Sequence, residues 1–147
     1  MTLIPAISLW QPHASLLFVS DPLLRKQHET RRQPLPARCC GVRVAIHATQ
    51  TSPKRMPDGL PDPHQLAVEA FGWDYREALP RGAIIGTLIF GGCVPSDGAV
   101  PASEADRIAG DWSPGRFIWS VRDRVLLPRP IPTKGRQGWF KAEVPPA

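Results

Sequence analysis

The sequence has 147 residues, of which 42% are apolar and 21% charged, with a net charge of +5. These proportions are typical of one globular domain, and we expect a single domain over residues 1–147. The 18 prolines and 12 glycines exclude a long helical bundle and predict many loops. The longest uncharged apolar stretch, residues 83–94, is too short for a membrane span, which needs ~20 residues.

The first third of the chain predicts three strands and one short helix. Residues 4–9 are an apolar run typical of a strand, and Pro12 suits the first turn of a helix that continues to about Val19. Residues 26–32 are expected to form a second strand before a proline-rich loop. Residues 42–48 carry β-branched side chains in near alternation, which predicts a third strand.

The remainder predicts one more helix and up to four strands. A helix is expected over residues 63–72, and a nearly all-apolar strand over 83–94, buried on both faces. The glycines within that strand indicate a bend, as at the corner of a barrel. One helical turn is expected at 103–108, strands at 116–121 and 125–127 with a turn between them, and a last strand at 139–144.

This order of elements predicts an α+β fold. Strands and helices do not alternate regularly, which argues against a doubly wound parallel sheet. We expect a small, mixed, curled β-barrel of five to seven strands, with two or three short helices packed on its side. The chain shows no internal repeat and no second domain.

The charges are unevenly distributed. Basic residues, mostly arginine, gather in segments 23–43 and 115–141, and these flank an acidic segment, 57–111. If the two basic segments meet in space, they form one basic face, and arginine suits bidentate contacts with phosphate. The alternative is dispersed, solvated charge.

The sequence lacks the motifs that mark several common kinds of functional site. It contains no glycine-rich phosphate loop and no nucleophile elbow. The histidines lack metal-ligand spacing, and Cys39, Cys40 and Cys93 do not form a disulfide framework. We therefore expect no metal, no cofactor and no disulfide. The first residues lack a basic region and a small-residue cleavage site, so we expect a cytoplasmic protein.

The segment around Glu29 is the strongest chemical candidate. In a strand, Glu29 and Arg31 share one face, and Lys26 can turn toward Glu29. A lysine beside a second cation can act as a base, and a carboxylate between cations can accept an N–H of a nucleobase. A structural salt bridge at the mouth of a barrel is the alternative.

This segment belongs to a longer series of motifs. It follows the run Ser-Leu-Trp-Gln-Pro over residues 8–12 and precedes Arg-x-x-Gly at 38–41 and Ile-His-Ala at 46–48. Pro-x-Gly at 80–82, Pro-Ile-Pro-x-Lys-Gly at 130–135 and Trp139 continue the series. Together these motifs resemble the ASCH (activating signal cointegrator homology) domain family over nearly the whole chain.

The resemblance implies a PUA-like barrel with a cleft between the barrel and the N-terminal helix, and binding of RNA or modified nucleotides. Some members of the wider family hydrolyse acylated cytidine, and others have been described as nucleases. The residues carried over to the cleft lining are Trp10, Gln11, Lys26, Glu29, Arg31, Arg38 and Lys134.

Two positions depart from the family pattern. His13 stands where the family often has Trp, which predicts either a more polar wall or a titrating group. Glu29 stands where the acylcytidine amidohydrolases carry a Thr nucleophile, and the adjacent Thr30 would face away from it. Hydrolysis would then need another nucleophile, such as water activated by Glu29.

Three hypotheses follow. The first is a nucleic-acid-binding module for RNA or a modified nucleotide, with DNA also possible. The second is a small hydrolase on a modified nucleoside, or a ribonuclease, with Lys26 as catalytic base and Glu29 as catalytic acid/base. The third is a protein-interaction adaptor that uses the acidic segment.

Overall fold

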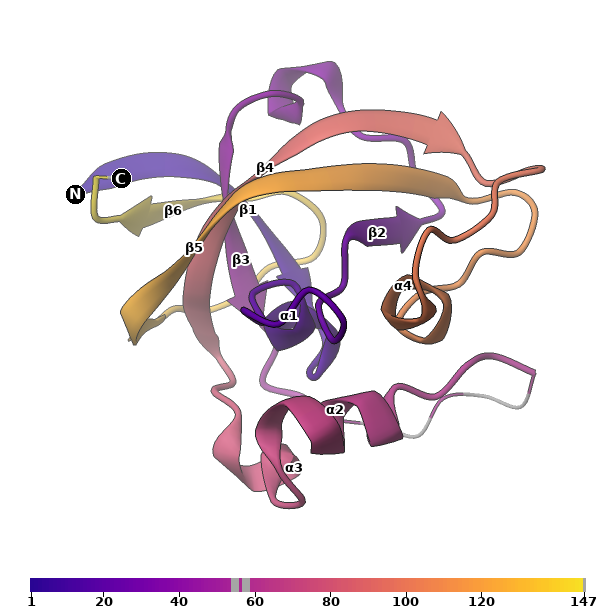
Figure 1. Cartoon of the computed structure of the whole chain (residues 1–147). Coiled ribbons are helices and arrows are strands. Elements are labelled where there is room, and N and C mark those ends of the chain that lie inside the picture. Colours follow the sequence, from indigo (N-terminus) through magenta and orange to yellow (C-terminus); the bar gives the residue numbers. More distant parts are fainter. Residues whose placement is uncertain (54–55, 57–58, 147) are drawn as a thin grey trace.

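One curled sheet organises the molecule, which is described here from a computed structural model covering residues 1–53, 56 and 59–146. The sheet order is β2-β5-β4-β3-β1-β6, and only β1 and β3 are parallel. Figure 1 shows the two termini side by side, where β1 and β6 pair. The strands are β1 (Thr2–Leu9), β2 (His28–Arg31), β3 (Arg43–Ala48), β4 (Ala83–Pro95), β5 (Phe117–Pro132) and β6 (Phe140–Val144).

The α+β class, the mixed sheet and its curl are as predicted. Within the described residues, however, the sheet is not closed, because β2 and β6 are its two edge strands. The predicted division of residues 116–127 into two strands is wrong, since β5 runs through it without a break. Asp123 accommodates the bend there with a φ of 53°, and the pairing with β4 shifts register on either side.

The helices are short. The four α-helices are α1 (His13–Leu16), α2 (His64–Phe71), α3 (Tyr75–Ala78) and α4 (Glu104–Ile108), and a 3₁₀ turn covers Ala37–Cys39. Helix α1 ends earlier than predicted, α2 lies where it was expected, and α3 was not predicted. In Figure 1, α2 and α3 lie below the end of the sheet, and α4 lies beside β2. None of the described helices is long and apolar enough to cross a membrane.

The core lies on the inner side of the curl. Residues 83–88 of β4 are buried, as expected for a strand covered on both faces. The prediction is wrong for residues 91–94, because this end of the strand runs past the core and Val94 is 55% exposed. Trp119 of β5 is 1% exposed and packs edge-on against Phe90 at 5.2 Å between ring centroids. It also stacks on Trp139 at 6.0 Å. All three cysteines are free thiols, as predicted.

Replacing Gly86 in β4 with alanine is expected to destabilise the fold. A Cβ atom there would lie 2.6 Å from the Phe18 ring and 2.7 Å from the Val125 carbonyl oxygen, so strand and ring must move apart. Overpacking of this kind costs about 1–3 kcal/mol, measurable by urea unfolding. Gly92→Ala is the matched control, because its nearest atom is 3.5 Å away. An equal loss in both variants would contradict this explanation.

Candidate functional site

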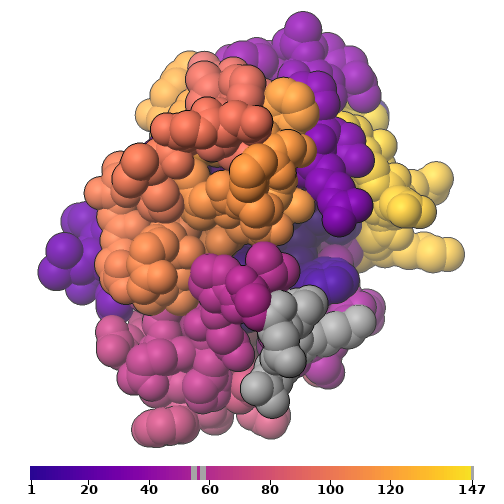
Figure 2. Space-filling model, turned by 90° about the vertical axis from the view of Figure 1, so that its right-hand side faces the viewer, coloured from indigo at the N-terminus to yellow at the C-terminus, as the bar shows by residue number. Residues whose placement is uncertain are grey.

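Two adjoining cavities lie beside the ends of β1 and β3. Their volumes are about 820 and 360 Å³, and both are bordered by Ser8, Trp10 and Arg31. We call the two together the cleft. The larger cavity is closed on one side by the loop 132–138, and the smaller one extends toward β2 and residues 109–111. Figure 2 shows this side of the molecule as hollowed, with N-terminal residues deep between later segments.

A buried ion pair lines the smaller cavity. Lys26 Nζ lies 2.7 Å from Glu29 Oε1, and the two side chains are 2% and 6% exposed. The same oxygen accepts a hydrogen bond from the Thr30 backbone N–H at 3.2 Å, and Arg31 Nη1 lies 3.8 Å from Glu29 Oε2. The Lys26 backbone N–H donates to the Leu16 carbonyl, which ties the pair to α1. The predicted cluster of ammonium, carboxylate and guanidinium is therefore present.

The surroundings keep Glu29 ionised. Burial by itself raises the pKa of a carboxyl, but the charges of Lys26 and Arg31 outweigh burial and hold the pKa of Glu29 below its usual value. At neutral pH this carboxylate only accepts hydrogen bonds. It suits recognition of an N–H group, or a role as a base, better than donation of a proton.

His13 forms a neutral part of the wall. Its Nδ1 lies 3.1 Å from the Ala109 carbonyl oxygen. Because a carbonyl only accepts, Nδ1 carries the proton and donates it there. Burial, together with the nearby Lys26 charge, lowers the pKa of His13 from 6.5 to about 4. Of the two roles predicted for this position, the structure favours the polar wall over a group that titrates near neutral pH.

We expect acid to destabilise the protein through His13. The unfolded chain takes up a proton near pH 6.5 and the folded chain only near pH 4, so stability rises with pH between these values. The difference corresponds to about 3 kcal/mol. His13→Gln, whose amide can still donate to Ala109, should flatten that slope in urea unfolding at a series of pH values. An NMR titration that finds His13 protonating near 6.5 would contradict the expectation.

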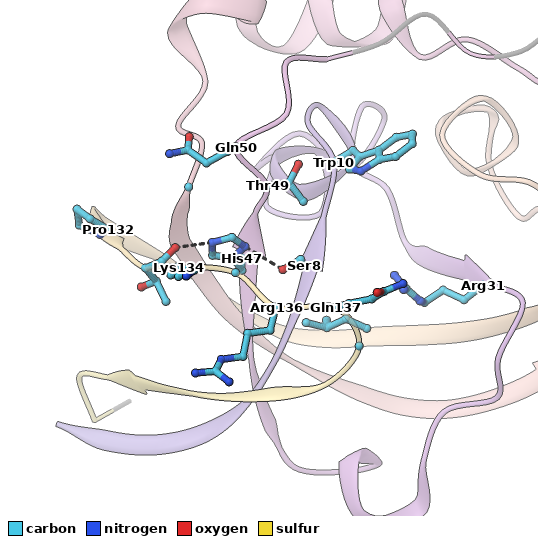
Figure 3. A pocket seen from close by; sticks show the side chains of 15 residues that line it. Ser8, Trp10, Arg31, His47, Thr49, Gln50, Pro132, Lys134, Arg136 and Gln137 are labelled. Atoms are coloured by element: carbon cyan, nitrogen blue, oxygen red, sulfur yellow. Dashed lines mark hydrogen bonds between the residues drawn. The ribbon is translucent and has the colours of Figure 1, made fainter.

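A second hydrogen-bonded group borders the larger cavity. The parallel pairing of β1 and β3 places Ser8 beside His47. Ser8 Oγ lies 2.9 Å from His47 Nδ1, and His47 Nε2 lies 2.7 Å from the Thr133 carbonyl oxygen. Figure 3 shows both bonds, with His47 between Ser8 and the loop that carries Lys134. His47 is 2% exposed. In the sequence, both residues belong to the motifs at 8–12 and 46–48, but neither was assigned a role in the site.

Not all of the predicted site residues meet at the cleft. Trp10 and Arg31 border both cavities, Lys26 and Glu29 the smaller one, and Lys134 the larger one. Gln11 is instead buried, and its amide donates to Ser15 Oγ and to the Pro80 carbonyl oxygen, which holds the start of α1 in place.

Arg38 lies away from the other predicted residues. It borders a separate, smaller cavity together with Trp139 and Lys141. Arg31 from the first basic segment does share the larger cavity with Lys134 and Arg136 from the second. The two basic segments therefore meet at the cleft, but part of their charge lies elsewhere.

Comparison with known proteins gives a likeness to solved structures alone. No family model matches the chain, and no curated protein matches it. An ASCH structure from Zymomonas mobilis is 20% identical with a TM-score of 0.47, covering 86% of this chain and 71% of that chain. One mutant form of the Zymomonas protein is 21% identical with a TM-score of 0.46, covering 86% of this chain and 72% of that chain. A second mutant form is 22% identical with a TM-score of 0.47, covering 86% of this chain and 73% of that chain. These structures are ASCH domains, the family that the sequence motifs resemble.

The described residues give no indication of a metal centre. Among them, no three His, Cys, Asp or Glu side chains gather as metal ligands would. The described side chains at the cleft include cations, an ionised carboxylate and a hydroxyl–imidazole pair.

Proposed function

We propose that this protein binds RNA or a modified nucleotide in the cleft. The observation that carries the proposal is the junction of the two cavities, where Arg31 borders both the buried Lys26–Glu29 pair and the cations of the loop 132–138. Such a junction offers a nucleotide two different environments: an acceptor for a base, and positive charge for a phosphate.

The dimensions of the cleft support this function. Small-molecule sites in proteins have volumes of roughly 300–1,000 Å³, and the cavities measure about 820 and 360 Å³. A base bound in the smaller cavity would leave the larger one for the sugar and phosphate. Trp10, 49% exposed, borders both cavities, and an aromatic ring there can stack on a base.

The charges support the same orientation. In the smaller cavity, ionised Glu29 accepts an N–H from a base, and the Lys26 ammonium can donate to a carbonyl or ring nitrogen. In the larger cavity, Arg31, Lys134 and Arg136 supply donors for phosphate oxygens. If the phosphate backbone of RNA continues beyond the cleft, RNA would bind more tightly than a free nucleotide.

Binding of labelled single-stranded RNA, single-stranded DNA and mononucleotides at several salt concentrations tests the proposal. Arg31→Gln and Lys134→Gln should each weaken binding by about 10-fold or more, as expected for loss of a charge-assisted hydrogen bond. They should also reduce the dependence of affinity on salt. Arg129→Gln is the matched control, because Arg129 is exposed on β5 and outside both cavities. Absence of binding, or an equal loss in the control, would contradict the proposal.

A hydrolase that uses Lys26 and Glu29 is the second candidate, and the burial of this ion pair within the cleft favours it. Ionised Glu29 can activate water as a base. Glu29→Gln distinguishes the two functions on a panel of acylated cytidines and short RNAs, because an amide cannot shuttle a proton. In a binding module this change alters which base is preferred. In an enzyme it leaves binding nearly unchanged and removes turnover.

A further inference from the structure

The hydrogen bonds of His47 determine where its proton lies. The Thr133 carbonyl oxygen can only accept, so the proton shared with it is on Nε2. In the neutral imidazole, Nδ1 then holds a lone pair, and the Ser8 hydroxyl must be the donor across their 2.9 Å contact. This is the arrangement in which an imidazole can withdraw the proton of a serine, with a third group orienting the ring.

The position of Ser8 gives this arrangement access to a ligand. Ser8 is only partly buried and borders both cavities, whereas His47 lies behind it, buried between strand and loop. A side chain at Gly135 would come within 2.5 Å of His47 and 3.1 Å of Ser8 Oγ. Glycine at this point lets the loop close over the imidazole without covering the hydroxyl.

We propose that Ser8 and His47 form a nucleophile and general base that cleave an acyl group from a nucleotide held in the cleft. The proposal rests on the proposed nucleotide binding for its substrate. The nucleophile is Ser8 and not the residue at position 29, and Lys26 has no role in this reaction.

The reaction is an acyl transfer in two steps. Ser8 Oγ attacks the carbonyl carbon of the ester and its proton passes to His47 Nδ1, while Nε2–H stays bound to Thr133. Collapse of the tetrahedral intermediate breaks the bond to the nucleotide oxygen, which takes the proton from His47 and leaves as an alcohol. Water, deprotonated by His47, then cleaves the acyl-Ser8 ester to a carboxylic acid and free Ser8. Arg31 and Lys134, at the same cavity, supply positive charge toward the oxyanion.

The partners of the pair indicate the substrate class. His47 is oriented by a neutral backbone carbonyl instead of a carboxylate, so its imidazolium receives less stabilisation than in a triad. An ester, with its better leaving group, is therefore favoured over an amide. The cations of the larger cavity favour a substrate that carries phosphate. Together these features favour a nucleotide acylated on a ribose hydroxyl.

Labelling with an alkyl fluorophosphonate, followed by peptide mass spectrometry, tests the nucleophile without any nucleotide. We expect covalent modification at Ser8, none in Ser8→Ala, and a rate about 100-fold or more lower in His47→Gln, the usual contribution of a general base. Ser20→Ala, at an exposed serine outside both cavities, is the control and should label like wild type. Circular dichroism and urea unfolding of each variant show that it is folded. If His47→Gln fails this check, the comparison of wild type with Ser8→Ala decides.

Hydrolysis of 2′(3′)-O-acetyl-AMP by the full chain tests the substrate class. Multiple turnovers that are lost in Ser8→Ala would support the proposal. Labelling at Ser8 without turnover would overturn the substrate class. Failure to label Ser8 in a protein that still binds nucleotides would overturn the nucleophile and leave the proposed function standing. Labelling of Ser8 in a protein that binds no nucleotide would leave the nucleophile standing and overturn both the proposed function and the substrate class.

Discussion

Replacing Lys26 with methionine is expected to lower the free energy of unfolding by about 3–5 kcal/mol, the usual cost of leaving one buried charge without its partner. Methionine keeps the unbranched apolar stem, so the packing changes little. The Glu29 carboxylate, however, would stay 6% exposed without the ammonium that lies 2.7 Å away. Because Arg31 is 3.8 Å away and partly exposed, it cannot replace that interaction fully. Urea unfolding at pH 7 measures the loss.

Two further variants distinguish the loss of the ion pair from a non-specific loss of stability. The double variant Lys26→Met/Glu29→Gln removes both charges and should recover part of the lost stability, because no buried charge is left unpaired. Arg107→Met is the matched control, since Arg107 pairs with Glu104 at an exposed site of the same i,i+3 spacing, and it should change stability little. A Lys26→Met protein as stable as wild type would show that the pair is not buried in solution.

The same pair predicts the direction of a pH effect. Because the pKa of Glu29 is lowered on folding, its contribution to stability is present above the unfolded value of 4.5 and is lost as pH falls through the folded pKa. Lys26→Met removes the charge that most lowers this pKa, so the variant should gain less stability than wild type as pH rises from acid to neutral.

Replacing Asp106 of α4 with alanine is expected to cost roughly 2–6 kcal/mol, because buried donors left without a partner cost about 1–3 kcal/mol each. Asp106 is 1% exposed. Its Oδ1 accepts from the Gln27 and His28 backbone N–H groups at 2.7 and 3.0 Å, and Oδ2 lies 2.8 Å from His28 Nδ1. The carboxylate therefore holds the start of β2, the strand that carries Glu29 and Arg31 into the cleft.

Urea unfolding and amide hydrogen exchange measure this effect. Hydrogen exchange should accelerate more at the Gln27 and His28 amides than at the amides of the core strands. Asp97→Ala is the control, because exposed Asp97 accepts one backbone bond, from Gly115 at 3.0 Å, and its loss should cost less than about 1 kcal/mol. Nucleotide binding should weaken in Asp106→Ala and not in the control. Equal exchange in both variants would contradict the assigned role.

Local patterns in the sequence were sufficient for most elements of the fold. The alternation over 42–48 and the apolar run over 83–94 predicted β3 and β4, because side-chain period and apolar length are properties of the strand itself. The division of β5 was wrong because charged residues around Asp123 are typical of a turn. In the structure, pairing with β4 on both sides keeps the bent strand continuous.

The same difference between local patterns and long-range pairing applies to the residues of the site. The approach of Lys26 to Glu29 follows from three-residue spacing at the start of a strand and was predicted from the sequence alone. The pairing of Ser8 with His47 joins residues 39 positions apart and depends on the register of two parallel strands. The separation of Arg38 from Arg31 likewise depends on where the 3₁₀ turn after β2 packs.

The sequence by itself determined which segments form strands and where the buried ion pair lies, since both depend on neighbours along the chain. Only the tertiary structure decided that the sheet stays open, that Gln11 supports α1, and that a hydroxyl and an imidazole meet at the cleft, because these depend on long-range pairing that no local pattern specifies.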